Sequence, residues 1–366
     1  MVREMVTVQV GQCGNQIGRR FWAELLHEAA AQQQSQAQAQ APSQGGGVGR
    51  YDAAMSAFFR NVDARYEPAA ELCVGSALSS VRARAILVDT EEGVVSETLR
   101  DPMFGDLFDA AQLVTDVSGA GNNWAHGYGE YGPKYGDEIE ASAATALEAC
   151  DSPQAFLFMH SVGGGTGSGL GSSVLERLSD AFPELCRFSA AVYPGGDDED
   201  VITAPYNAVL ATRRLTEHAD CVIPLENQAL LDVCARRNAR QATAAAGTSK
   251  HSAGARARED AAKKKKSEQA GFDEMNDVAA QLLSHLTAGA RYSGGLNVDV
   301  NEIATNLVPF PRLHYLTASR DRRVCELPTS LQLISVRKER IQCARALPRD
   351  DRSSKRGRRS RRPGAF

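Results

Sequence analysis

The sequence lacks the features that mark several other classes of protein. No apolar run approaches the length that spans a bilayer, and the first residues hold neither an apolar signal core nor a cleavage site. The eight cysteines are scattered, without a CxxC pair or the His/Cys spacing of a zinc site. We therefore expect no membrane partner and reduced thiols, as in the cytoplasm.

The chain also carries little excess charge. Its formal net charge is −4 over 366 residues, with 23% charged and 43% hydrophobic residues. This balance is ordinary for a water-soluble globular protein, and it argues against a nucleic-acid partner across the whole surface. The length is enough for one large domain or two moderate ones.

Two common phosphate-binding motifs are missing, but a third kind of glycine loop is present. A P-loop needs a lysine after its final glycine, whereas Leu170 follows Gly169. The Rossmann spacing of glycines does not occur in any register of the loop. The loop lies between a buried-strand candidate at 155–159 and an amphipathic helix, so a flexible linker is a poor alternative.

This loop predicts an anion site. Glycines let the backbone approach a phosphate closely, and the helix that follows contributes its positive end. The Ser161 hydroxyl stands just before the loop. The candidate ligands are Gly163, Gly164, Gly165, Thr166, Gly167, Ser168 and Gly169.

Strand and helix patterns alternate along the first two thirds of the chain. Val6, Val8 and Val10 form a short strand pattern, and a glycine-punctuated turn leads from it into a helix. This alternation predicts an α/β fold with a doubly wound parallel sheet. We expect a nucleotide-binding domain over 1–235, interrupted by a flexible low-complexity insertion at 30–49.

The remaining third is less regular. Residues 236–270, with four consecutive lysines, predict a flexible charged insertion; a patch for an anionic partner is the alternative. Residues 271–319 should hold a core helix and the start of an incomplete second domain. Residues 320–366 read as a basic, disordered tail.

Four motifs in order along the chain resemble the tubulin superfamily. They are the glycine loop 163–169, the segment Val10–Gly18, the segment Gly119–Ala125 and the segment Asn306–His314. The resemblance extends from about residue 5 to 316. It implies a tubulin-type GTPase fold that binds GTP or GDP with Mg²⁺ and assembles with other tubulin subunits into microtubules.

On the phosphate side, the resemblance implies roles for residues of three further loops. Asp89 and Glu91 match the acidic loop beside Mg²⁺ and the γ-phosphate, and Mg²⁺ prefers such hard oxygen ligands. A solvated acidic turn is the alternative. Asn122 matches an asparagine whose amide reaches the phosphates. The first helix would add nucleotide contacts from Gln12, Cys13 and Gln16.

On the nucleoside side, Asn227 and Asn276 match the two residues that hydrogen-bond guanine, for which an amide offers both a donor and an acceptor. Phe272 stands where the family has a stacking tyrosine. The family's ribose-binding glutamate is Ala204 here. Asp200 is a candidate to replace it.

The hydrolytic group would come from another subunit. Glu302 matches the glutamate that orients water against the γ-phosphate of a neighbouring subunit's GTP. A surface residue near a helix N-terminus is the alternative. Hydrolysis would therefore be a composite activity, whereas a free-standing GTPase switch would carry this group for its own pocket.

Four segments, Phe58–Asp63, Glu91–Val95, Asp200–Asn207 and Glu217–Val222, resemble the epsilon subfamily more than the alpha, beta or gamma forms, with delta as the nearest alternative. This resemblance implies a cytoskeletal protein of centrioles, centrosomes or basal bodies. After Leu316 the tubulin pattern ends, through either a gene-model artefact or a genuine short form. We expect an unpaired apolar strand near Leu313–Leu316 to be exposed, and hence aggregation or weak nucleotide binding.

Overall fold

The computed structural model describes residues 3–39, 49–50, 53–62, 71–72, 81–195, 201–246, 260–292, 298–318 and 342–343. Among these residues, no helix combines the length and apolarity needed to span a bilayer.

The predicted doubly wound parallel sheet is confirmed. Six parallel strands lie in the order β7-β6-β1-β8-β9-β10, and β1 is buried along its whole length. From β7 the strand order runs backward in sequence to β1 and then forward from β8, so the direction of winding reverses between β1 and β8. The strands are β1 (Glu4–Val10), β6 (Ala85–Asp89), β7 (Leu113–Thr115), β8 (Pro153–Ser161), β9 (Cys186–Tyr193) and β10 (Cys221–Glu226).

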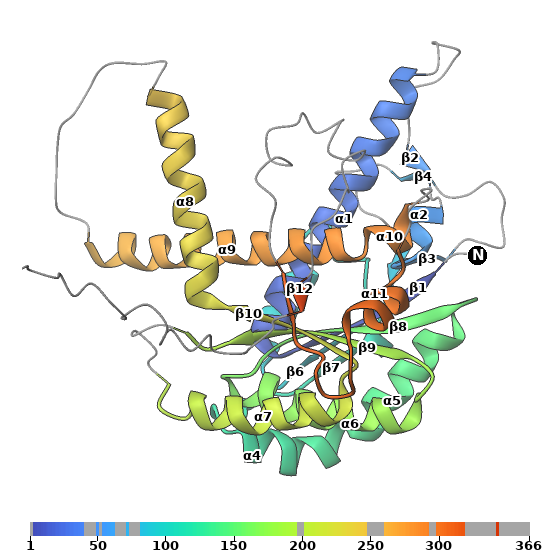
Figure 1. Cartoon of the computed structure of the whole chain (residues 1–366), viewed down its shortest axis with the longest axis vertical. Helices are drawn as coiled ribbons and strands as arrows, with labels where there is room; N and C mark the ends of the chain where they lie inside the picture. Colours follow the sequence, from blue (N-terminus) through green and yellow to red (C-terminus); the bar gives the residue numbers. More distant parts are fainter. Residues whose placement is uncertain are drawn as a thin grey trace, which may run out of the picture.

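Helices cover both faces of the sheet (Figure 1). One face packs against α1 (Gly11–Ala39), α3 (Glu92–Arg100), α9 (Asp260–Leu286), α10 (Ala288–Arg291) and α11 (Val300–Leu307). The other face packs against α5 (Gly132–Glu148), α6 (Gly171–Ala181) and α7 (Ala204–His218). Burial on both sides explains the continuous apolar runs in β6 and in the middle of β8. In β1 the buried valines alternate with the buried polar residues Thr7 and Gln9.

One long helix and several short elements complete the described fold. Helix α8 (Asn227–Ala246) follows β10, and α4 (Trp124–His126) leads into α5 through the π-helical turn η2 (Gly127–Tyr131). A second π-helical turn, η3 (Thr166–Leu170), leads into α6. The others are β2 (Gly49–Arg50), α2 (Ala53–Ser56), β3 (Phe59–Asn61), β4 (Glu71–Leu72), β5 (Val81–Ala83), η1 (Ala110–Gln112), β11 (Leu316–Thr317) and β12 (Gln342–Cys343).

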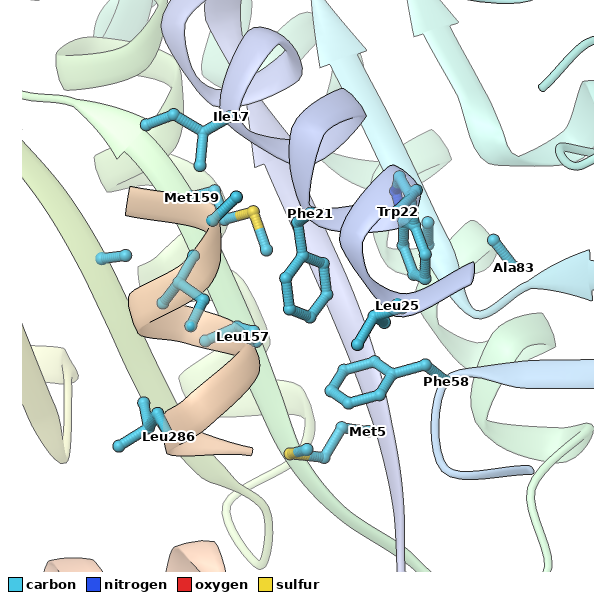
Figure 2. Packing of buried hydrophobic residues seen from close by; sticks show 14 of the residues in the cluster. Met5, Ile17, Phe21, Trp22, Leu25, Phe58, Ala83, Leu157, Met159 and Leu286 are labelled. Atoms are coloured by element: carbon cyan, nitrogen blue, oxygen red, sulfur yellow. The ribbon is translucent and has the colours of Figure 1, made fainter. Parts of the chain in front are cut away.

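The core beneath α1 is built on aromatic side chains (Figure 2). Phe21 and Trp22 meet edge to face with ring centroids 5.5 Å apart, and Phe21 meets Phe58 at 5.3 Å. All three side chains are fully buried. Because Phe58 immediately precedes β3, this cluster fixes the short β3–β5 pair against the helix.

One ion pair lies inside the fold at the amino end of β1. The Arg84 guanidinium lies 2.5 Å from Glu4 Oε1, and both side chains are almost completely buried. Arg84 also donates to the Ala149 carbonyl, and the other Glu4 oxygen accepts from the Ser152 backbone. The pair is thus supported by further hydrogen bonds, as a buried charge requires.

Helices extend into segments that the composition predicts to be flexible. Residues 30–39 continue α1, 236–246 continue α8, and 260–270 form the beginning of α9. Alanine, glutamine, lysine and arginine are all good helix formers, so low complexity was a poor guide to backbone structure here. Residues 40–48 and 247–259 lie outside the described residues, as do 319–341 and 344–366 of the predicted tail.

The prediction that the strand at Leu313–Leu316 is exposed is wrong for Leu316. Leu316 is fully buried, and only Leu313, at 55%, is exposed. Tyr315 pairs in parallel with Val222, whose N–H donates to the His314 carbonyl at 2.9 Å. This segment therefore lies against the β10 edge of the sheet through one bridge, with Leu316 buried, so the predicted exposure of an apolar strand is not found.

Candidate functional site

The carboxyl ends of β1 and β8 meet at the point where the winding of the sheet reverses. In open α/β sheets, ligands bind in the crevice at such a switch point. Gly11 begins α1 with φ +74°, and a Cβ on it would lie 3.0 Å from the Gly167 nitrogen. A Cβ on Gly14 would lie 2.1 Å from the Met159 carbonyl oxygen. The two glycine loops therefore touch backbone to backbone, as the sequence alone could not show.

The glycines of the loop after β8 serve two different purposes. Gly163 and Gly164 line a cavity of about 170 Å³, and a Cβ on either would meet no atom within 3.4 Å. By contrast, a Cβ on Gly167 would lie 2.6 Å from the Ser161 carbonyl oxygen, and one on Gly169 would lie 2.4 Å from that of Trp124. The first two glycines keep a surface open, whereas the later ones allow close packing.

The hydroxyl groups at this loop are already engaged in part. Ser168 is fully buried and donates to the Gly164 carbonyl, so its hydroxyl shapes the loop. Ser161 lines the cavity and accepts from the Gly163 N–H at 3.2 Å. Thr166 shares a hydrogen bond of 2.5 Å with Thr90 of the acidic loop. This last contact joins the glycine loop to the segment that follows β6.

A buried histidine supports the glycine loop, and sequence analysis did not predict it. His160 is the penultimate residue of β8 and is 2% exposed. Its Nδ1 lies 3.0 Å from the Gly167 carbonyl oxygen and its Nε2 lies 2.9 Å from Ser189 Oγ. Because a carbonyl can only accept, the neutral ring carries its proton on Nδ1. Burial lowers the pKa of His160 from 6.5 to about 4.

Asp89 ends β6 beside the two glycine loops. It is 4% exposed; its Oδ1 accepts from the Glu91 N–H at 3.3 Å, and its Oδ2 has no hydrogen-bond partner among the described residues. Burial raises the pKa of Asp89 from 3.8 to about 6. The unpaired, buried Asp89 Oδ2 is therefore suited to bind a cation that comes from solution together with the ligand. Glu91 is exposed and lies against Gly119 of the next loop.

The described residues contain no cluster of three or more side chains that would bind a metal on its own. Two carboxylates are nevertheless the donor set that suits Mg²⁺ bound with water and phosphate oxygens. Asp89 and Glu91 therefore fit such an ion only together with a phosphorylated ligand.

Asn122 lies in the loop before α4 and faces the glycine loop. Its backbone is left-handed, with φ 52°, a conformation that asparagine tolerates better than most residues. Its Oδ1 lies 3.9 Å from the position of a Cβ on Gly164. Its carbonyl oxygen accepts from Thr203 Oγ1 at 2.7 Å and from Asn207 Nδ2 at 2.8 Å, both at the start of α7. The sequence did not reveal this role of Asn207.

The other side of the cavity comes from β9, β10 and α7. Asn227 lies at the junction of β10 and α8, half-buried. Ala204 is buried at the first position of α7, with no polar side-chain atom to offer. Asp200 lies outside the described residues. The cavity is lined by Ser161, Gly163, Gly164, Pro194, Val201, Ala204 and Asn227.

The remaining candidates lie on α1 and α9, which pack together. Arg20 of α1 pairs with Asp273 of α9 at 2.8 Å, next to Phe272, which is 54% exposed. Asn276 is half-buried on the same helix. Among the candidates on α1, Gln12 is exposed, whereas Cys13 and Gln16 are half-buried; burial raises the pKa of the Cys13 thiol to about 12. None of these side chains lines the 170 Å³ cavity.

Glu302 lies at the opposite end of the sheet from the glycine loops. It is exposed in the first turn of α11, where its N–H donates to the capping Asp299 at 2.7 Å. Asp299 also lies 3.3 Å from Arg3, which precedes β1. The seven residues of β1 span roughly 20 Å, so Glu302 cannot reach the loops of its own chain.

Comparison with known proteins gives a consistent result. A model of the GTPase domain of the Tubulin/FtsZ family matches residues 4–235. The chain is 46% identical to the human tubulin epsilon chain over 316 residues, covering 86% of this chain and 63% of that relative. It is 34% identical to the tubulin alpha-3 chain of Saccharomyces cerevisiae, covering 86% of this chain and 60% of that protein. The chain thus spans less than two thirds of the length of these relatives.

Proposed function

This chain belongs to the Tubulin/FtsZ family, and from that premise we propose that it binds GTP and is an epsilon-type structural subunit of the microtubule cytoskeleton. One observation carries the binding proposal. Two glycine loops meet, backbone against backbone, at the switch point of a parallel sheet, beside an open cavity. Such an arrangement presents backbone N–H groups and a helix N-terminus to an anion.

The phosphates would lie against Gly163–Gly165 and Thr166, with the Asn122 amide on the facing loop. Asp89 and Glu91 would hold Mg²⁺, and the bound ion would neutralise negative charge on the phosphates. The unpaired Asp89 Oδ2 supports this assignment, because a bound cation would compensate the cost of burying it.

Guanine would be recognised by amides on two elements, Asn227 after β10 and Asn276 on α9, with Phe272 stacking on the base. The sugar side differs from the family pattern. Ala204 is buried at the cavity wall, so a side-chain acceptor for the ribose is missing there. We expect weaker discrimination between GTP and its 2′-deoxy form than a glutamate at this position would give.

Hydrolysis would be completed where two subunits meet. Glu302 would act on the GTP of a neighbouring tubulin subunit, because roughly 20 Å of strand separates it from its own glycine loops. The family relationship and the epsilon-chain similarity support a cytoplasmic, cytoskeletal role at centrioles, centrosomes or basal bodies. A delta-type or non-polymerising GTP-binding protein is the competing proposal.

Binding is tested by titrating the full chain with a fluorescent GTP analogue, with and without Mg²⁺, against competing GTP, dGTP and ATP. GTP should compete and ATP should not. Equal competition by ATP, or no binding of the analogue, would refute the nucleotide proposal.

The composite site is tested by measuring GTP turnover per subunit over a range of protein concentrations. Turnover should fall on dilution, and Glu302→Gln should abolish it without changing GTP affinity. Asn306→Ala, an exposed change on the same helix, is the matched control. A rate per subunit that stays constant on dilution would favour the free-standing switch.

A further inference from the structure

The first two turns of α7 connect the loops that flank the candidate phosphate site. Asn207 is 3% exposed and uses its amide in three hydrogen bonds. Its Nδ2 donates to the Asn122 carbonyl at 2.8 Å and to the Gly163 carbonyl at 2.9 Å, and its Oδ1 accepts from the Trp124 N–H at 2.9 Å. One side chain therefore holds both the loop before α4 and the loop after β8.

We propose that Asn207 is a positioning residue for the phosphate-binding loops, setting the orientation of two backbone segments without touching the ligand itself. This inference rests on the proposed binding of GTP. Asn207 does not line the cavity, whereas Gly163 does and Asn122 faces the adjoining Gly164.

The bond to Gly163 has a direct consequence for an anion. A carbonyl oxygen that faced the phosphates would repel them, and Asn207 holds this one on its own amide. The Gly164 N–H belongs to the same planar trans peptide unit and so points the opposite way. Among the described residues, it donates no backbone hydrogen bond, which leaves it available for a ligand.

The bonds to Asn122 act in the same way on the facing loop. Asn122 has a left-handed backbone, and its carbonyl oxygen is held from α7 by both Asn207 and Thr203. With its carbonyl held by two donors, the residue cannot rotate freely, and its amide stays directed at the glycine loop. Asn207 thus determines how far apart the two phosphate-facing groups lie.

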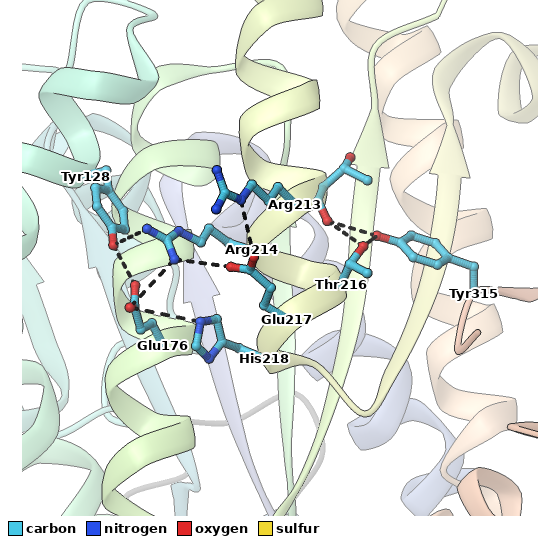
Figure 3. Close-up of polar contacts among 9 residues, drawn as sticks. Tyr128, Glu176, Arg213, Arg214, Thr216, Glu217, His218 and Tyr315 are labelled. Carbon is cyan, nitrogen blue, oxygen red and sulfur yellow. Dashed lines mark hydrogen bonds and ion pairs between the residues drawn. The ribbon is translucent and has the colours of Figure 1, made fainter. Parts of the chain in front are cut away.

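Helix α7 is well anchored for this role (Figure 3). The Arg214 guanidinium lies 4.9 Å from the centre of the Tyr128 ring and donates to its hydroxyl at 2.8 Å. Tyr128 stacks on Trp124 with centroids 4.5 Å apart, and the Trp124 N–H returns to Asn207. These contacts link Arg214 to Asn207, on the same helix, through Tyr128 and Trp124.

A purely structural role predicts a different result from a positioning role. If Asn207 only satisfied buried backbone groups, its loss would lower stability and weaken every nucleotide equally. If it positions phosphate-binding groups, its loss must weaken GTP more than GMP, because both share guanine and ribose but only GTP has the β- and γ-phosphates.

The test measures the affinity of the full chain for mant-GTP and mant-GMP. Asn207→Leu should weaken mant-GTP by about tenfold or more and mant-GMP by less than about threefold. Thr203→Val, at an exposed position, removes only the second donor to Asn122 and should give a smaller change with the same preference. It serves as the main test if Asn207→Leu does not fold.

Thr216→Val is the matched control, because it removes a hydroxyl contact of the same helix with Tyr315, at 3.1 Å, far from both loops. It should leave the ratio of the two affinities unchanged. Equal losses for mant-GTP and mant-GMP in the Asn207 and Thr203 variants would overturn the inference while leaving the proposed function intact. A wild-type chain that binds neither nucleotide would overturn both.

Discussion

Replacing His160 with asparagine should remove a defined part of the acid sensitivity of this fold. The histidine lies beneath the glycine loop, between the Gly167 carbonyl and the Ser189 hydroxyl, and burial lowers its pKa to about 4. In the unfolded chain the same group has a pKa near 6.5. An asparagine at this position keeps a donor for the carbonyl and does not titrate.

The direction in which folding stability changes with pH depends on whether the folded or the unfolded state binds the proton. Above about pH 6.5 both states are neutral, and the group contributes no pH dependence. As the pH falls below that value the unfolded chain is protonated while the folded chain is not, so folding stability decreases. The loss for a shift of this size is about 2 kcal/mol by about pH 5 and reaches about 3 kcal/mol below pH 4.

The measurement is urea unfolding of the wild-type chain and of His160→Asn at about pH 7.5 and about pH 5. At the higher pH the variant should be less stable by about 1 kcal/mol, through the lost contact with Ser189. At the lower pH the difference in stability should shrink or reverse. Protonation of residue 160 stabilises the unfolded state of the wild type, but asparagine in the variant binds no proton. Other titrating groups, such as His314, are present in both proteins and cancel. A stability difference that stays constant with pH would refute the reasoning.

Three further predictions concern packing and charge. Gly167→Ala should lower the free energy of unfolding by about 2–3 kcal/mol, because its Cβ would lie 2.6 Å from a carbonyl oxygen. Gly164→Ala should unfold in urea like the wild type, because a Cβ there would meet no atom within 3.4 Å, but it should bind mant-GTP more weakly. Equal stability of the two variants would contradict the conclusion that Gly167 is needed for packing and Gly164 is not. Asp89→Asn should stabilise the nucleotide-free chain by roughly 1–3 kcal/mol and weaken Mg²⁺-dependent GTP binding; a destabilised variant would show that the unpaired oxygen has a partner. Glu4→Gln should cost about 3–5 kcal/mol in thermal or urea unfolding because it leaves the Arg84 guanidinium buried without its counter-charge, and a loss below about 1 kcal/mol would argue against that burial.

The strands and the glycine loop could be predicted because their signals are local. A run such as Ala85–Val88 is apolar throughout, and a glycine loop between a strand and a helix has few other uses. At the helical ends of α1, α8 and α9, composition predicts flexible insertions, but the residues there are good helix formers and the helices continue through them.

The supporting residues of the site could not be found from local pattern. His160 reads as one more residue of a buried strand, and Asn207 as a polar residue early in a helix. Their importance lies in partners 29 and 85 positions away, Ser189 and Asn122, which are brought close only by the fold. Likewise, residue identity suggested a nucleotide contact for Ser168, but its hydroxyl is turned to the Gly164 carbonyl in the structure.

The strand pairing at Tyr315 has a consequence for how molecules of this chain meet in solution. An open edge strand with free N–H and C=O groups is a template on which another chain can add in β-pairing, the first step of ordered aggregation. On the β10 side, Val222 already donates to the His314 carbonyl, so a second molecule would have to displace this contact to pair with the beginning of β10. On the other side, the edge is β7, only three residues long. Within the described residues, one edge of the sheet is thus engaged at its beginning by the same chain, and the other is too short to hold a partner strand firmly.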